Sequence, residues 1–510
     1  MKNIILDCYT DEPSGYGVRP FIGTHQIHLA QALTYIGEKY DYITIDDIRY
    51  NNDKLCNNSD LINKHNSGNS QKLINNVTNN KDIALQLIND ADIIYLVMGC
   101  FVEYEYFSSK PPKSDEVYEY LKNSKAKKIL FYVLGGEDFK QGNFKSSKLH
   151  NIIHDICFGN TYRYVLNDFK DSNDNLLEPN YNLLEKISHS YPYLIEQIGK
   201  PIIAEIETGT GCNTPTCSYC IECKRKIKPI YREPSDIICQ INILYKSGVR
   251  HFRLGRQPNF YHYQYKNVSK LDELLSGIRS TCPDLKTLHI DNANMVDVAT
   301  DVGEEFTKLI VKYCTSGNIA PFGIESFDQK VRNKIHITGN TDQILRAIEI
   351  INKYGAVRDS DGFLKLIPGI NLIYGLSDNE KETHEINLKF LEKIKNNNFL
   401  TGRLFYRKLT NYSGITFDLA ANNNEEYLKF KNEIVNNYVL PIQSKVFPKK
   451  TILKGFNEVM NYNGISQMRR YDTCSIRVEV VSNKSLLNNK NYNVEVIDNI
   501  DSKLLSCKLI

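Results

Sequence analysis

From residue 201 to residue 410, the sequence alternates short apolar runs with longer amphipathic segments. The apolar runs predict strands, and the segments between them predict helices. The predicted strands cover residues 201–207, 249–254, 286–290, 319–325, 369–374 and 402–407. Strands that alternate with helices in this way form a parallel sheet. Because a closed barrel needs eight such units, six of them predict an open, partial (β/α)6 barrel over residues 201–410.

Different patterns lie on either side of this barrel. Residues 1–150 also alternate apolar runs with helical segments and predict a Rossmann-like α/β domain, with an Asn-rich insertion at 51–81. Residues 151–200 are expected to be a connector and 411–473 a helical linker. Residues 474–510 alternate apolar and polar residues in short runs, which predicts a small all-β unit. The predicted fold class is therefore α/β, with the partial barrel between a Rossmann-like domain and a β tail.

The composition excludes several classes of protein. The chain has 510 residues, 41% of them hydrophobic, which is enough for packed cores, and its net charge of +3 is unlike that of a histone-like binder of nucleic acid. No apolar run approaches the roughly 20 residues that span a bilayer, and the first residues are not typical of a secretory signal. We expect a cytoplasmic protein that does not act at a membrane and whose cysteines stay reduced.

Four cysteines lie close together directly after the first predicted barrel strand. Cys212, Cys217, Cys220 and Cys223 have the spacing C-x4-C-x2-C-x2-C. Thiolates at such spacing bind zinc or an iron–sulfur cluster. A structural zinc site usually has two C-x2-C pairs separated by a longer loop, whereas one short loop can wrap three corners of a cubane. The pattern therefore favours an iron–sulfur cluster, with a structural zinc site as the alternative.

Several further motifs accompany the cysteines in a fixed order. Tyr219 precedes Cys220, and the later strands carry GVRHFRLGRQ, LHIDNAN, GIES and INLIYGL. With these motifs the chain resembles the radical S-adenosylmethionine (SAM) superfamily, and within it a mainly archaeal group of uncharacterised iron–sulfur oxidoreductases. A more distant resemblance is to the methylthiotransferases of tRNA and ribosomal proteins. Those proteins have an N-terminal α/β domain, this barrel and a small β-barrel tail, which implies a TRAM- or OB-like tail here.

The resemblance implies a ligand set and a partner. In this superfamily three cysteines bind three irons of a [4Fe-4S] cluster, and SAM binds the fourth iron. Cys212, Cys217 and Cys220 would be those ligands, although the first gap is one residue longer than the usual C-x3-C-x2-C. Cys223 would then be a spare thiol, a neighbour of the cluster or an alternative ligand. The cluster would be reduced by a protein of the ferredoxin or flavodoxin type.

Polar residues at the ends of the predicted strands are the candidates for binding SAM. A carboxylate or amide there can bind ribose hydroxyls, and an arginine can pair with the methionine carboxylate. The candidates are Glu325, Ser326, Asn292, Asp291, Gln257 and Arg253. Asn294, Arg256, Arg403 and Arg407 occupy similar positions. A rim of hydrated or ion-paired side chains is the alternative explanation for all of them.

Other cofactors are possible in the N-terminal domain but are not favoured. Cys8, Cys56 and Cys100 could bind a second iron–sulfur cluster, as three cysteines do in methylthiotransferases, but Cys56 lies in the Asn-rich insertion. Cobalamin bound through a histidine is not expected, because the pattern D-x-H-x-x-G is absent. The glycines of GGED at 135–138 could approach a ligand, although a plain tight turn explains them equally well.

These features predict a radical SAM enzyme that modifies RNA or protein, by methylthiolation or methylation. The basic run KRKIKP at 224–229 could contact RNA or be a hydrated loop. Two alternatives remain: radical chemistry on a small metabolite, and a metal-stabilised RNA-binding protein without catalysis. The sequence identifies no catalytic residue.

Overall fold

A computed structural model describes most of the chain. The described residues are 1–9, 21–55, 77–99, 111–132, 147–168, 176–199, 201–225, 227–409, 423–462, 464–470, 476–482, 485–487 and 490–510. They fall into two compact units. The N-terminal unit holds Met1–Ile206 and Ser235–Phe252, and the barrel unit holds Glu207–Pro234, Arg253–Thr410 and Ile415–Ile510. The division runs through two strands, β7 (Ile203–Glu207) and β10 (His251–Gly255).

The N-terminal unit is built on a parallel sheet with the strand order β3-β1-β4-β5-β6. The strands are β1 (Asn3–Asp7), β3 (Tyr40–Thr44), β4 (Ile93–Met98), β5 (Lys127–Tyr132) and β6 (Asp155–Phe158). Ile4, Leu6, Ile94 and Leu96 are buried in one hydrophobic core, as expected for strands covered on both faces. The fifth strand, β6, lies within the segment predicted to be a connector.

Helices and one further strand pair complete the N-terminal unit. Its helices are α1 (Thr24–Tyr35), α2 (Ile45–Leu55), α4 (Ala84–Asp90), α5 (Ser114–Leu121), η3 (Leu149–Ile152), α7 (Thr161–Val165), α8 (Tyr181–Ser188), α9 (Leu194–Ile198) and α11 (Pro234–Lys246). β2 (Phe21–Ile22) pairs in parallel with β7. α11 is joined to α1 by a hydrogen bond from Gln240 Nε2 to Gln31 Oε1, 2.8 Å long. A helix that follows the cysteine loop in sequence thus belongs to the N-terminal unit.

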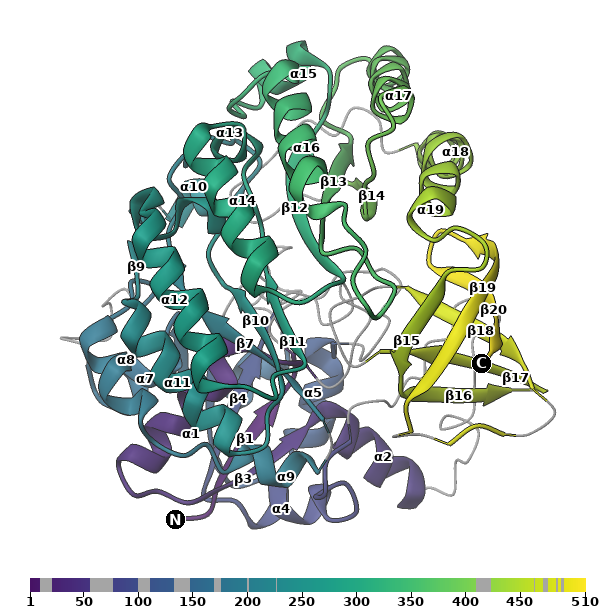
Figure 1. Ribbon diagram of the computed structural model, residues 1–510. Coiled ribbons are helices and arrows are strands. Elements are labelled where there is room, and N and C mark those ends of the chain that lie inside the picture. The colour runs from purple at the N-terminus through teal and green to yellow at the C-terminus, as the bar shows by residue number, and fades with distance from the viewer. Residues whose placement is uncertain are drawn as a thin grey trace. The chain divides into compact units, whose positions relative to one another are not determined.

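The barrel unit continues the series of strands and helices (Figure 1). After β7 and β10 come β11 (Thr287–Ile290), β12 (Asn318–Glu325), β13 (Leu366–Tyr374) and β14 (Arg403–Lys408), and the last three form a parallel sheet. The long helices between strands are α12 (Val268–Thr281), α14 (Asp301–Tyr313), α16 (Thr341–Gly355) and α17 (Glu380–Asn396). Shorter elements are β8 (Gly209–Thr210), α10 (Ile221–Arg225), β9 (Ile230–Tyr231), η4 (Phe260–Lys266), α13 (Met295–Val298) and α15 (Gln329–Lys334). The six predicted barrel strands are therefore present.

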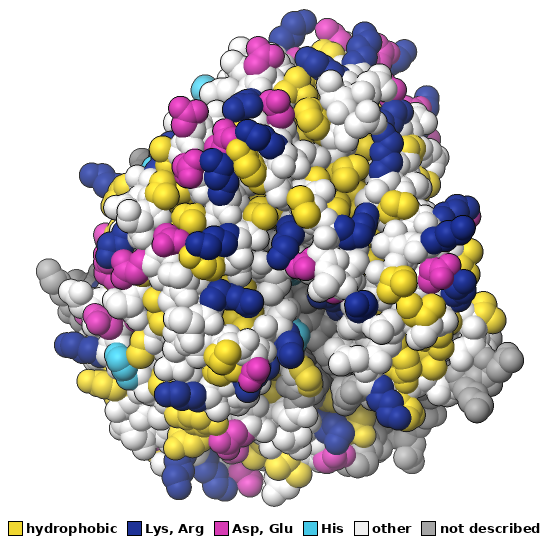
Figure 2. Space-filling view, in the orientation of Figure 1, with side chains coloured by type: hydrophobic (Ala, Val, Ile, Leu, Met, Phe, Trp, Pro, Cys, Tyr) yellow, Lys and Arg dark blue, Asp and Glu magenta, His cyan; other side chains and the backbone are white. Residues whose placement is uncertain are grey.

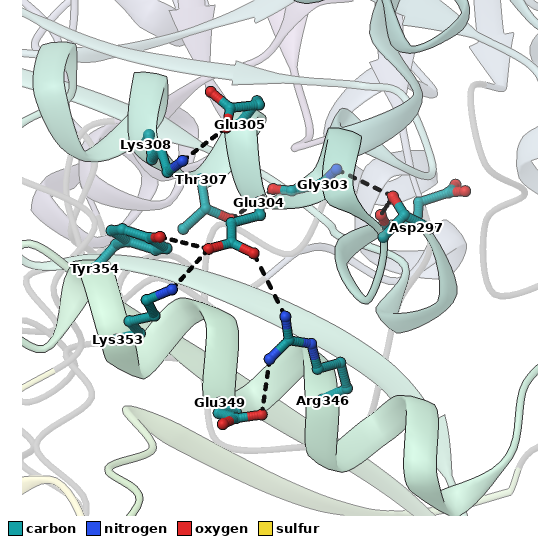
Figure 3. A network of polar contacts seen from close by, with 11 residues as sticks. Asp297, Gly303, Glu304, Glu305, Thr307, Lys308, Arg346, Glu349, Lys353 and Tyr354 are labelled. Carbon is teal, nitrogen blue, oxygen red and sulfur yellow. Dashed lines mark hydrogen bonds and ion pairs between the residues drawn. The ribbon is translucent and has the colours of Figure 1, made fainter.

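Helices α14 and α16 are joined by a polar cluster around Glu304 (Figure 3). The carboxylate accepts a hydrogen bond from Tyr354 and pairs with Lys353 at 2.9 Å and with Arg346 at 3.4 Å. The hydrogen bonds from Tyr354 and Lys353 lower the pKa of Glu304 to about 2. This carboxylate contributes to stability only while it is ionised.

The C-terminal part of the barrel unit is a six-stranded sheet of order β15-β19-β20-β18-β17-β16. Its strands are β15 (Ile452–Phe456), β16 (Glu458–Tyr462), β17 (Ile465–Arg469), β18 (Arg477–Val481), β19 (Tyr492–Asp501) and β20 (Leu504–Leu509). α18 (Asn424–Ile434), the π-helix Val435–Val439 and α19 (Leu440–Val446) precede it. The first three strands lie before residue 474, within the segment predicted to be only a helical linker.

The surface carries mixed charges. Figure 2 shows Lys and Arg side chains interspersed with Asp and Glu over the described part of one face, and the net charge of the chain is only +3. Within the described ranges, no helix combines the length and apolar character needed to cross a bilayer.

Candidate functional site

The cysteine loop begins where β7 ends, and backbone hydrogen bonds to two other segments hold its base. Thr208 N donates to Gly255 O over 3.2 Å, so the carboxyl ends of β7 and β10 lie side by side. The antiparallel pair β8–β9 then joins Gly209 to Tyr231 and closes the loop. Gly211 has φ of 82°, and a Cβ there would overlap the carbonyl oxygen of Lys228. Only glycine fits at this position, because the backbone is left-handed and the loop's return strand approaches so closely.

The turn after α15 supports the middle of the loop. Ser218 N donates to Ile335 O at 3.0 Å, and Thr216 Oγ1 donates to His336 O at 2.9 Å. Tyr219 packs against a small apolar cluster that includes Val331 and Ile335. Hydrogen bonds and apolar packing together fix the backbone conformation of the loop, so the thiols lie on an ordered segment.

The thiols of the loop are half-buried and electrostatically linked. Burial, with the neighbouring thiols adding to it, raises the pKa of Cys217 to about 12 and that of Cys220 to about 11. Burial also raises the pKa of Cys212. Cys223 is half-buried as well. Burial thus favours the neutral form of these three thiols in the metal-free protein.

Glu325 ends β12 close to this loop. Its side chain is only 8% exposed, and its backbone is left-handed with φ of 62°. Tyr219 Oη donates to Glu325 Oε1 over 3.0 Å. Burial raises the pKa of Glu325 to about 7, against the opposing effects of Tyr219, Arg407 and Arg332. The carboxyl group can therefore gain or lose a proton near neutral pH when a ligand binds.

Arg332 of α15 holds the backbone on both sides of Glu325. Its Nη1 donates to Ile324 O at 2.6 Å and to Ser326 O at 3.3 Å, and the side chain is completely buried. A buried guanidinium bonded to these carbonyl groups fixes the unusual backbone of Glu325. The same helix and the turn after it thus support both the cysteine loop and Glu325.

The other predicted binding residues occupy different environments. Arg253 and Asp291 are both buried and form an ion pair with each other. Ser326 Oγ accepts from Asp328 N at 3.1 Å, and Asn292 is exposed. Gln257 is 2% exposed, and neither polar atom of its amide has a hydrogen-bond partner among the described residues. Within this set, Glu325 shares a hydrogen bond with the cysteine loop, and the amide of Gln257 has unused hydrogen-bonding groups.

Comparison with known proteins identifies the family. No protein-family model matches the chain. It is 31% identical over 536 aligned residues to an uncharacterised protein of Methanocaldococcus jannaschii, and the match covers 98% of this chain and 91% of that protein. The chain belongs to the family of this archaeal protein. An uncharacterised protein of Archaeoglobus fulgidus is 28% identical, over 88% of this chain and 79% of its own.

The fold is that of radical SAM enzymes. The cobalamin-dependent SAM radical enzyme OxsB, with aqua-cobalamin and SAM bound, matches with a TM-score of 0.50 and 13% sequence identity, over 85% of this chain and 55% of OxsB. The predicted fold class is thus confirmed. A shorter similarity, 22% identity over 36% of this chain and 38% of the relative, is to the tRNA-2-methylthio-N(6)-dimethylallyladenosine synthase of Azobacteroides pseudotrichonymphae.

The residues of the cysteine loop and the neighbouring strand ends fit a cluster and a polar cofactor. Three half-buried thiols in one supported loop are suitable donors for three irons of a cubane. Among the described residues, no three His, Cys, Asp or Glu side chains are grouped closely enough to hold a single metal ion. The ligands of a cubane bind separate irons and therefore stand farther apart. The unpaired amide of Gln257 and the carboxyl of Glu325 supply polar groups for a ligand at the same strand ends.

The sequence did not reveal one network that supports the loop. Asp297 accepts from Asn213 Nδ2 at 3.2 Å and from Asn259 Nδ2 at 2.5 Å, and it pairs with Lys266 at 2.5 Å. Asn213 directly follows Cys212. Nothing in the spacing of these four residues indicates that they meet, because each lies in a different loop or short helix.

Proposed function

We propose that the chain is a radical SAM enzyme in which Cys212, Cys217 and Cys220 hold a [4Fe-4S] cluster. When bound, the cluster supplies the electron that cleaves SAM to a 5′-deoxyadenosyl radical. The observation that carries the proposal is a supported loop of half-buried thiols, hydrogen-bonded through Tyr219 to Glu325 at the end of a parallel strand. Cys223 remains outside the proposed ligand set.

The residues around the loop would bind and orient SAM. Glu325 offers a carboxylate oxygen to a hydroxyl or ammonium group, and a neighbouring positive charge would favour the ionised carboxylate over the protonated form. Gln257 offers an amide that can both donate and accept. Tyr219 and Arg332 hold Glu325 in place, and the pair of Arg253 and Asp291 holds the ends of β10 and β11 together.

The proposed substrate is RNA or protein, and the proposed reaction is methylthiolation or methylation. The local similarity to a tRNA methylthiolating enzyme supports this substrate class. Mass spectrometry of RNA and protein from a deletion strain would test it. Disappearance of a methylthio or methyl group from one residue or nucleotide would support it, whereas a change confined to a small metabolite would contradict it.

Anaerobic reconstitution tests the radical SAM activity itself. We expect about four iron and four sulfide per chain, with 5′-deoxyadenosine released from SAM upon reduction. Cys212→Ala, Cys217→Ala and Cys220→Ala should each lose the cluster, and the matched control Cys223→Ala should keep it. Stoichiometric zinc without SAM cleavage would refute the activity. Loss of the cluster in Cys223→Ala, with retention in Cys212→Ala, would move the ligand set to 217, 220 and 223.

A corrinoid in the N-terminal unit is a second candidate cofactor. Numbered in chain order, the five strands of this sheet have the spatial order 2-1-3-4-5, and sheets of this order bind ligands at the carboxyl ends of the two strands where the order reverses, here β1 and β4. The likeness of the fold to cobalamin-bound OxsB supports a corrinoid there. Cys8 is buried, and Cys56 and Cys100 lie outside the described residues. Retention of hydroxocobalamin through gel filtration would support the corrinoid, and its complete loss would exclude it.

A further inference from the structure

An exposed tyrosine lies beside the end of the cysteine loop and is held firmly. Tyr265 of η4 is 66% exposed. Its hydroxyl donates to Pro229 O over 2.9 Å, which ties the tip of the side chain to the chain leaving the loop. The ring contacts Tyr231 at 5.2 Å and His262 at 6.0 Å between centroids, both nearly perpendicular. The residue is thus largely exposed, although its hydroxyl group and its ring are both held by contacts.

The backbone that presents this ring is unusual. Gln264, Tyr265 and Lys266 have φ of 46°, 55° and 66°, three successive non-glycine residues in the left-handed region. Such residues cost conformational energy, so their surroundings must hold them. Gln264 Nε2 donates to Arg232 O at 2.9 Å, and Lys266 pairs with Asp297. Specific side-chain contacts thus stabilise this backbone conformation, in which Tyr265 is exposed.

Positive charges precede the residue that anchors the ring. Residues 224–228 contain Lys224, Arg225, Lys226 and Lys228. Arg225 pairs with Glu222 at 2.8 Å, whereas Lys228 is exposed and is the neighbour of Pro229 in the chain. An exposed tyrosine bonded to the residue that follows an exposed lysine matches the two surfaces of a single-stranded nucleic acid, a base face and a phosphodiester.

We propose that Tyr265, with Lys228 beside it, is a stacking site for a nucleobase of single-stranded RNA next to the cysteine loop. This inference rests on the proposed function, in which the substrate is RNA or protein, and it favours RNA. A duplex is a poor ligand for such a site, because its base faces are already stacked. The site would hold an unpaired nucleotide close to the place where the radical is formed.

Fluorescence anisotropy with a short labelled single-stranded RNA tests the site in the full-length protein. Stacking on one aromatic ring is sequence-tolerant, so Tyr265→Ala should weaken binding about 5- to 150-fold. Tyr265→Phe should keep most of the affinity, since it keeps the ring. Lys228→Gln should reduce the slope of log affinity against log salt by about 0.7. The matched control is Tyr193→Ala in the N-terminal unit, where the tyrosine is 52% exposed; this variant should bind as wild type.

Three results would overturn the stacking site: wild-type affinity in Tyr265→Ala, equal affinity for a duplex of the same sequence, or no RNA binding by the wild type at low salt. Circular dichroism of Tyr265→Ala and Tyr265→Phe shows whether a loss comes from misfolding. SAM cleavage by the reconstituted protein without RNA separates the two proposals. Cleavage without RNA binding leaves the radical activity standing and removes the stacking site, and RNA binding through Tyr265 without cleavage does the reverse.

Discussion

Replacing Glu325 by Gln should stabilise the metal-free protein at alkaline pH and leave it unchanged in acid. The Glu325 pKa is raised in the fold from 4.5 to about 7, mainly by burial. Below pH 4.5 the carboxyl is protonated in both the folded and unfolded chain. Between pH 4.5 and 7 only the unfolded chain loses the proton, so the free energy of unfolding decreases as the pH rises. Above pH 7 the carboxylate is ionised in the folded chain too, and the full free-energy penalty of burying its charge lowers the free energy of unfolding.

The size of the effect follows from the two pKa values of Glu325. They differ by about 2.5, which corresponds to about 3 kcal/mol, since a pKa difference of one is worth 1.36 kcal/mol. A glutamine side chain in place of Glu325 would have nearly the same shape and could still accept the hydrogen bond from Tyr219, but it would carry no charge to be buried. We therefore expect Glu325→Gln to raise the free energy of unfolding by about 3 kcal/mol at pH 8 and by almost nothing at pH 4.5.

Hydrogen exchange of peptides that contain β12 measures this free energy locally, without requiring both units to unfold together. The matched control is Glu304→Gln on α14. Because the Glu304 pKa is lowered to about 2, its carboxylate stabilises the fold above pH 4.5 and loses this effect as the pH falls toward 2. Glu304→Gln should therefore lower the free energy of unfolding at pH 8, whereas Glu325→Gln should raise it. An equal effect of Glu325→Gln at pH 4.5 and 8, or destabilisation at pH 8, would refute the argument from burial.

Three further predictions concern the supports of the site. Gly211→Ala should destabilise the barrel unit more than Gly464→Ala in a thermal melt, because both residues have positive φ but only at Gly211 would the new Cβ meet backbone within 4 Å; equal shifts would contradict the close approach. Arg332→Gln removes the charge-assisted hydrogen bonds to the carbonyl groups of Ile324 and Ser326, at about 1.5–3 kcal/mol each, and should weaken SAM binding in calorimetry; unchanged SAM affinity would show that Glu325 holds its position alone. Arg253→Met should cost about 3–5 kcal/mol in chemical denaturation by leaving Asp291 buried and unpaired. Adding Asp291→Asn should recover part of that loss, and simple additivity would contradict the pairing.

The barrel strands were predictable, whereas the contacts among site residues were not. The predicted strand 319–325 is β12 at Asn318–Glu325, because a buried strand leaves a continuous apolar run in the sequence. β16, with the sequence EVMNY, has no comparable run and was missed. Arg253 and Asp291 were both found at strand ends, but their pairing depends on how two strands lie in space. Arg332 could not be found at all, since nothing in the sequence shows a helix residue reaching back to the carbonyls around Glu325.

The placement of α11 has a consequence for the order in which the chain can fold during synthesis. Domains fold as units as they leave the ribosome, starting from the N-terminus. The N-terminal unit, however, includes Ser235–Phe252 and is completed only when that segment has emerged. The cysteine loop at 212–223 emerges earlier. Its thiols are therefore exposed on the nascent chain before the first unit is complete, and truncation after residue 206 would remove a helix from that unit.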